Sequence, residues 1–370
     1  MPTEHITCKK RINFIQNKLF LREIKKLMAE RLMLICGPCS AESEEQVLET
    51  ARELKKLVAP DYFRAGIWKP RTRPDSFEGV GEKGLAWMKR VQDELKVPVI
   101  TEVANASHVE RIAGYGFKAF WIGARTVANP FSVQEIAEAA KGYGFKVFVK
   151  NPTNPDIDLW CGAIERFQKL GFEDIVAVSR GFYPFTETKL RNLPCWEIPI
   201  ELARRMPELK IICDPSHIAG DTRYIAEIAQ QAINLNMAGL MMESHCCPSN
   251  ALSDRNQQLT PKELKSFIDG LKIKHSVIDD RNFEMELETL RSKIDVLDYQ
   301  FIDILKQRFA ITNEIGEIKK LRNVAVLQID RWKKVLESRS EYAEKQGLSR
   351  ELVATLFSEI HKESIKEQGE

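Results

Sequence analysis

The stretch "LMLICGPCSAESEEQVLETARELKKLV", residues 32 to 58, joins a short apolar run to a longer segment with helical periodicity. A buried strand followed by an amphipathic helix is the repeating unit of a parallel sheet. Apolar runs that begin such units recur at residues 32–36, 62–68, 97–103, 119–124, 146–150, 175–179, 210–214 and 239–243. Eight units predict a (β/α)₈ TIM barrel of the usual ~250 residues, and a doubly wound open sheet is the alternative.

Composition limits the classes of function. The chain has 370 residues and a net charge of only +2, which does not favour nucleic acid as a partner. We find no signal peptide and no run near the ~18 apolar residues of a membrane span, so we expect a cytoplasmic protein. The eight cysteines are scattered through apolar segments, as is typical of a reducing compartment.

The first unit contains a C-x-x-C pattern, Cys36-Gly37-Pro38-Cys39. In a cytosolic βα setting this spacing is often a thioredoxin-like redox pair. However, a thioredoxin-like domain would not need eight βα units. The alternative is that Cys39 acts alone, as one member of a site at the end of the first strand.

The ends of the other predicted strands also carry reactive or charged side chains. In a TIM barrel the active site is built from residues at the carboxyl ends of the strands. The cations at these ends are Arg64, Lys69, Arg71, Arg125, Lys150 and Arg180. Because converging cations repel one another, gathering them at one mouth is costly unless an anion binds there. We therefore expect phosphorylated or carboxylated substrates.

A candidate metal set lies at the same mouth. Its members are Cys39, His217, Glu243 and Asp254. A thiolate, an imidazole and two carboxylates suit a borderline divalent ion. We expect Mn²⁺, with Fe²⁺, Co²⁺ or Zn²⁺ as alternatives.

Several motifs carry a resemblance that covers about residues 31 to 260. They are "GPCSAES", "FRAGIWKPRTRPDSFEGVGEKGL", "WIGARTV", "VFVKNP", "SRGF", "CDPSHIAGD", "MMESHCCP" and "ALSDRNQQL". This segment resembles the 3-deoxy-D-arabino-heptulosonate 7-phosphate (DAHP) synthases with compact barrels. The resemblance implies that Cys39 binds metal and that Cys36 is a strand residue, which removes the redox interpretation.

The resemblance also implies a reaction, the condensation of phosphoenolpyruvate with erythrose 4-phosphate and release of phosphate. By matching motif, phosphoenolpyruvate would be held by Arg64, Lys69, Arg125, Lys150 and Arg180. The aldose phosphate would be held by Pro70, Arg71 and Thr72. The metal would act as a Lewis acid on the aldehyde oxygen. Lys69 would donate a proton, and Glu102 would orient the attacking water.

The βα pattern stops near residue 271. We expect a barrel domain over residues 1–271, a linker over 272–282 and an all-helical domain over 283–370. One long helix reaching about residue 321 has apolar residues at steps of three and four, interrupted by Arg308. It is too long for two shorter helices to cover, so we expect a second copy of the chain to complete an intertwined homodimer. A plain dimerisation coiled coil is the simplest interpretation.

Arg308 argues against that simplest interpretation, because a charge in an apolar seam is costly unless an anion meets it. Lys319, eleven residues further on, falls on the same helix face. The segment resembles the all-helical chorismate mutases in "LETLRSKIDVLDYQFIDILKQRFAITNEIGEIK", "QIDR" and "IHKESIKEQ". Their reaction, chorismate to prephenate, needs no acid, base or nucleophile, and its catalysis is positional and electrostatic.

By matching motif, Arg308 and Arg331 would bind carboxylates together with Arg291 of the other subunit. Lys319 and Gln368 would donate to the ether oxygen, and Ser364 would add a polar contact. Gln328 stands where the resemblance leads us to expect an acidic residue. Its amide can still bond the substrate hydroxyl, so we expect function with altered affinity.

Two broader expectations complete the sequence analysis. Because several steps separate the two reactions, we expect the fusion to serve feedback control of the synthase by prephenate or chorismate. The closest alternative is a barrel that makes 3-deoxy-octulosonate 8-phosphate from arabinose 5-phosphate, with a helical domain that only dimerises or regulates. A further alternative is an inactive scaffold.

Overall fold

The structure is a computed structural model that describes residues 32–69, 77–185, 187–273 and 281–369. Within them, eight parallel strands close a barrel in the order of the sequence, from β1 to β8 and back to β1. The strands are β1 (Met33–Gly37), β2 (Tyr62–Arg64), β3 (Val99–Val103), β4 (Ala119–Ile122), β5 (Lys146–Lys150), β6 (Ile175–Ser179), β7 (Lys210–Cys213) and β8 (Gly239–Glu243). The predicted TIM barrel is confirmed.

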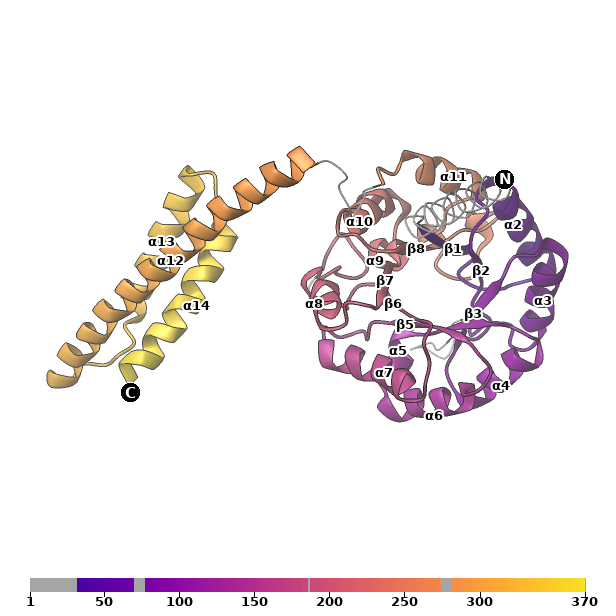
Figure 1. Cartoon of the computed structure of the whole chain (residues 1–370), viewed down its shortest axis with the longest axis horizontal. Helices are drawn as coiled ribbons and strands as arrows, with labels where there is room; N and C mark the ends of the chain where they lie inside the picture. Colours follow the sequence, from indigo (N-terminus) through magenta and orange to yellow (C-terminus); the bar gives the residue numbers. More distant parts are fainter. Residues whose placement is uncertain (1–31, 70–76, 186, 274–280, 370) are drawn as a thin grey trace, which may run out of the picture. The chain divides into compact units, whose positions relative to one another are not determined.

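Helices surround the barrel, as Figure 1 shows. They are α2 (Glu44–Leu57), α3 (Lys83–Leu95), α4 (Ala106–Gly114), α5 (Ala124–Val127), α6 (Pro130–Ala140), α7 (Ile157–Lys169), α8 (Glu197–Arg205), α9 (Pro215–Ala219), α10 (Thr222–Asn234) and α11 (Pro261–Gly270). None of the helices in the described ranges is both long and apolar enough to span a membrane.

Local sequence explains why the first helix begins and ends where it does. The side chain of Ser43 accepts a hydrogen bond from Gln46 N at the start of α2. Glu44 and Glu45 lie in the first turn, and two lysines lie in the last turn. These charges oppose the helix dipole at both ends and stabilise the helix.

One predicted strand was too long. The run at residues 62–68 predicted a strand throughout, but β2 ends at Arg64. Beyond it, Gly66 N donates to Cys39 O, and Gly66 O accepts from Ala41 N. These bonds hold the chain after β2 against the loop after β1, so the apolar residues that follow are buried without being in a strand.

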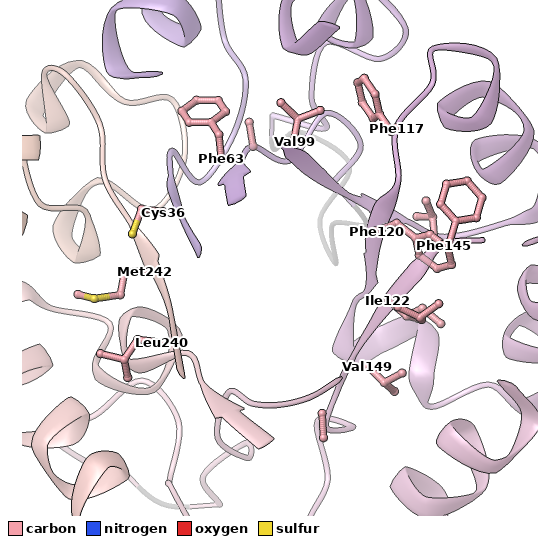
Figure 2. Packing of buried hydrophobic residues seen from close by; sticks show 14 of the residues in the cluster. Cys36, Phe63, Val99, Phe117, Phe120, Ile122, Phe145, Val149, Leu240 and Met242 are labelled. Atoms are coloured by element: carbon pink, nitrogen blue, oxygen red, sulfur yellow. The ribbon is translucent and has the colours of Figure 1, made fainter. Parts of the chain in front are cut away.

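Two apolar layers form the core of the barrel unit. The inner layer contains Ile35, Trp121, Phe148 and Ile212, and the outer layer lies between strands and helices. Neighbouring residues of one strand alternate between these layers. Figure 2 shows Cys36 in the outer layer near Met242. Cys36 is therefore a buried strand residue on the face that packs against helices.

The residue contacts divide the chain into two compact units, Met1–Ser276 and Val277–Glu370. The second unit contains α12 (Arg281–Leu321), α13 (Ile329–Lys345) and α14 (Arg350–Gly369). Helix α14 packs against both α12 and α13. The prediction of one long helix ending near residue 321 is confirmed, and its 41 residues span about 60 Å.

Candidate active sites

Three of the four predicted metal ligands lie together at the mouth of the barrel. The ligand atoms of Cys39, Glu243 and Asp254 are all within 4.8 Å of one another. The fourth, His217 on α9, has its Nε2 3.7 Å from Glu243 Oε1. Sulfur, nitrogen and carboxylate oxygen donors at this spacing fit a borderline divalent cation.

The electrostatics of the site suit a cation. Burial, together with the nearby charge of Glu243, raises the pKa of Cys39 to about 12. Lys69 Nζ donates to Cys39 Sγ at 2.8 Å, and Cys39 Sγ donates to Asp254 Oδ2 at 3.1 Å. Burial lowers the pKa of His217 to about 4, so its imidazole is neutral, the form that binds metals.

A polar network holds the carboxylates of this set. Arg64 donates to Glu243 Oε1 at 2.9 Å, and Gln257 donates to Glu243 Oε2 at 2.7 Å. Arg191 donates to Asp254 Oδ1 at 3.0 Å and to Gln257 Oε1 at 2.8 Å. Arg191 and Gln257 therefore connect Glu243 to Asp254. Sequence reasoning missed both residues: Arg191 lies outside the quoted motifs, and Gln257 lies in "ALSDRNQQL", where only Asp254 was predicted to have a role.

Asp214 forms a second buried centre next to the first. Its Oδ2 lies 2.8 Å from His217 Nδ1 and accepts a 2.8 Å hydrogen bond from Lys150 Nζ. It also lies 4.0 Å from Arg64 Nη1. A carboxylate beside the far nitrogen of a metal-binding histidine fixes the orientation of the ring. Its position directly after β7 is a sequence signal that could have identified it.

A cavity of about 190 Å³ opens beside these residues. Its lining includes the predicted cations Lys69, Arg125, Lys150 and Arg180, together with His217, Glu102, Asp254 and Arg191. Burial lowers the pKa of Arg180 to about 10, because the charged guanidinium is desolvated. A bound anion would offset that cost, as the clustering of cations at the strand ends predicted.

Arg180 and Arg64 are held in different ways. Arg180 Nη1 donates to Asn192 Oδ1 at 2.9 Å, and its backbone N donates to Asn151 Oδ1 at 2.7 Å. Arg64 is fully buried, and its guanidinium stacks 4.9 Å from the ring of Trp121. In the described part of the chain Arg64 does not line the cavity but supports Glu243 from within the barrel.

Glu102 enters the cavity because its neighbour is a glycine. A Cβ atom at Gly123 would clash with Glu102 Oε1. Trp121 Nε1 donates to Glu102 Oε2 at 3.1 Å and holds the carboxylate in that position. The motif "WIGAR" thus provides both the space for Glu102 and the cation Arg125.

The predicted aldose site, Pro70, Arg71 and Thr72, lies outside the described residues, as does the side chain of Gln368.

In the helical unit, Arg308 and Ser364 meet across two helices. Arg308 Nη1 on α12 donates to Ser364 Oγ on α14 at 2.8 Å. Lys319 donates to Val326 O at 2.6 Å. Arg308 and Lys319 are both half-buried, on the face of α12 that carries the buried Thr312 and Gly316. The expected shared face of the two cations is present.

Three other predicted residues are exposed. Arg291 pairs with Glu288 on the exposed surface of α12, about 25 Å along the helix from Arg308. Gln328 caps the start of α13 and is exposed, and Arg331 is exposed in the first turn. Arg291 of the same chain therefore cannot reach Arg308.

Comparison with known families agrees with both units. Residues 14–278 match the model of the DAHP synthetase I family, and residues 290–369 match that of chorismate mutase type II.

Individual relatives match the barrel unit. The phospho-2-dehydro-3-deoxyheptonate aldolase of Thermotoga maritima is 31% identical over 239 residues, which are 65% of this chain and 68% of that protein. Its crystal structure, a DAHP synthase, superposes with a TM-score of 0.59 at 29% identity and covers 66% of this chain and 72% of that one. A 2-dehydro-3-deoxyphosphooctonate aldolase of Hydrogenovibrio crunogenus is 26% identical over 68% of this chain and 94% of its own length.

The fold and the cavity define a barrel enzyme for anionic substrates, joined to a helical unit with its own cationic site. The chain belongs to the DAHP synthetase I family and carries a chorismate mutase type II domain at its C-terminal end. It is a bifunctional enzyme of the shikimate pathway, a transferase and an isomerase. Both resemblances expected from the motifs are confirmed.

Proposed function

We propose that the barrel condenses phosphoenolpyruvate with erythrose 4-phosphate in a metal-dependent reaction, and that Cys39, His217, Glu243 and Asp254 hold the metal. The single observation that carries this proposal is the placement of these four side chains beside the cationic cavity. Mn²⁺ is the ion we expect, with Fe²⁺, Co²⁺ or Zn²⁺ as alternatives. When bound, the metal supplies Lewis acidity toward the aldehyde oxygen.

The protein side chains have separate tasks in this proposal. Lys69, Arg125, Lys150 and Arg180 line the cavity and would bind the carboxylate and phosphate of phosphoenolpyruvate, which fixes the direction of its enol carbon. Arg64 does not line the cavity and would act indirectly, by holding the carboxylate of Glu243 in place. Pro70, Arg71 and Thr72 would bind the aldose phosphate.

Two further residues at the same cavity would handle the proton and the attacking water. Lys69, whose Nζ lies next to Cys39 Sγ, would donate a proton to the aldehyde oxygen as it becomes an alkoxide. Glu102, held by Trp121, would orient the water that attacks C2 of the intermediate.

The test is phosphate release from phosphoenolpyruvate with either aldose phosphate. We expect turnover with erythrose 4-phosphate, loss of turnover after chelation, and recovery when Mn²⁺ is added. Arabinose 5-phosphate should support at most a small fraction of that rate. Equal or faster turnover with arabinose 5-phosphate would favour the eight-carbon synthase, and a rate indifferent to chelation would contradict the metal site.

For the helical unit, we infer that Arg308 and Arg331 bind the carboxylates of chorismate and that Lys319 and Gln368 donate to its ether oxygen. Ser364 supports this set through its bond to Arg308. Gln328 is expected to contact the substrate hydroxyl from the edge. Such a site works by placing fixed positive charge where negative charge develops.

We also infer that two copies of the chain pair through α12. The apolar residues Leu290, Ile294, Leu297, Phe301, Ile304, Ile311, Ile315 and Ile318 are all exposed on a single chain. An exposed apolar stripe of this length is typical of a protein interface. Pairing would also bring Arg291 of a second copy within reach of a site that Arg291 of the same chain cannot reach.

We further infer that the helical unit controls the synthase. Prephenate or chorismate bound near Arg308 would lower condensation at the barrel, which requires that the ligand bind one state of the chain more tightly than another.

This regulation can be tested by titrating prephenate into the full chain while following phosphate release. We expect inhibition of the unaltered chain and loss of that response in Arg308→Ala, with the uninhibited synthase rate preserved. Equal inhibition of both proteins, or no inhibition of either, would exclude the mutase site as the sensor.

A further inference from the structure

His361 on α14 is a polar group that the proposed mutase site does not yet use. In the described part of the chain its Nε2 is buried and has no hydrogen-bond partner. Leaving such an atom unpaired costs free energy, so a native structure usually provides it with a partner. His361 lies three residues before Ser364, so the two share one face of α14. Ser364 in turn accepts from Arg308.

The imidazole is held in place by a neighbour on another helix. Its ring stacks on Trp332 of α13, with centroids 3.9 Å apart and planes 3° from parallel. Trp332 lies in the first turn of α13, which follows the N-cap residue Gln328. His361 therefore sits where α12, α13 and α14 each contribute a residue: Arg308, Trp332 and Ser364.

The surroundings also keep this imidazole uncharged. Burial lowers the pKa of His361, and the positive charges of Arg308 and Lys319 lower it further. These two cations are therefore close enough to act on the ring. A neutral imidazole can donate or accept a hydrogen bond but adds no charge.

We propose that His361 binds the ring hydroxyl of chorismate through Nε2. This inference rests on the proposed mutase site. In that site the arginines take the two carboxylates, and Lys319 and Gln368 take the ether oxygen, which leaves the hydroxyl as the polar group without a buried partner. Gln328 is exposed, and a hydrogen bond in a desolvated position discriminates more strongly than one in water. Stacking on Trp332 makes His361 a fixed partner, so it determines specificity.

The test compares chorismate with an analogue that lacks only the ring hydroxyl. His361→Phe keeps a flat ring against Trp332 but removes Nε2, whereas His361→Gln keeps a hydrogen-bonding group. We expect His361→Phe to lower kcat/KM for chorismate roughly 10- to 100-fold, the range for losing one desolvated hydrogen bond. Its kcat/KM for the deoxy analogue should stay near that of the unaltered chain.

The preference for the hydroxyl is the decisive readout, because a merely structural role would lower both values equally. His361→Gln should recover part of that preference, and Lys362→Ala, at an exposed neighbouring position, should change neither value. Equal loss for both compounds, or no loss in His361→Phe, would overturn the proposal. If the unaltered chain failed to convert chorismate at all, the proposed mutase site would fail instead.

Discussion

Cys39→Ala is expected to abolish condensation activity and to remove the bound divalent metal from the barrel. Its sulfur is the one soft donor in a set otherwise made of imidazole and carboxylates. Mutation of a residue that only supports a metal ligand typically lowers metal affinity or activity about 10- to 100-fold. Because Cys39 would itself be a ligand, we expect a larger loss here. The measurements are phosphate release and metal content per chain after dialysis.

Cys36→Ala is the matched control. Cys36 is fully buried on the outer face of β1, and burial raises its pKa to about 12, so its thiol is inert. Removing one buried sulfur should cost stability on the order of 1 kcal/mol and leave turnover within about threefold. Equal loss of activity in both variants would return the C-x-x-C pair to consideration as a functional unit.

Arg308→Ala is expected to lower kcat/KM for chorismate about 100- to 1,000-fold, the range for removing one positioned donor from an electrostatic site. The half-buried guanidinium faces α14, where Ser364 also donates to Ile360 O at 2.7 Å. That second bond remains after the substitution, so the packing of α14 should persist. Chorismate loss, followed by absorbance, measures the effect.

Arg350→Ala provides the comparison for charge alone. Arg350 is exposed at the start of α14 and pairs with Glu344 at 3.6 Å. Arg350→Ala removes the same charge from the same unit. The rate of chorismate conversion should nevertheless stay within about twofold of that of the unaltered chain, because an exposed ion pair contributes little to the stability of the unit. If Arg308→Ala behaved like Arg350→Ala, the helical unit would be a dimerisation element only.

The barrel could be predicted from sequence because its strands are short apolar runs at regular intervals. Residues 146–150, 175–179 and 239–243 coincide with β5, β6 and β8. The run at residues 62–68 misled because burial, not strand pairing, explains its apolar residues after Arg64. An apolar run indicates that its residues are buried, but it does not indicate which hydrogen bonds their backbone makes.

The site was predictable where a residue ends a strand or lies just after one. Cys39, Lys150 and Glu243 could be placed at the mouth by topology alone. Arg191 and Gln257 could not, because their importance depends on which side chains they contact across the loops. His361 likewise lay within a quoted motif, and only its unpaired nitrogen and its stacking on Trp332 distinguish it from an ordinary helix residue.

The central claim is that one chain carries two separate active sites, and it is tested most directly by measuring both activities in the same preparations. Phosphate release and chorismate loss should be assayed in the unaltered chain, Cys39→Ala and Arg308→Ala. We predict that Cys39→Ala loses only phosphate release and Arg308→Ala loses only chorismate conversion. Loss of both activities in either folded variant, or survival of both in the two variants, would contradict the account.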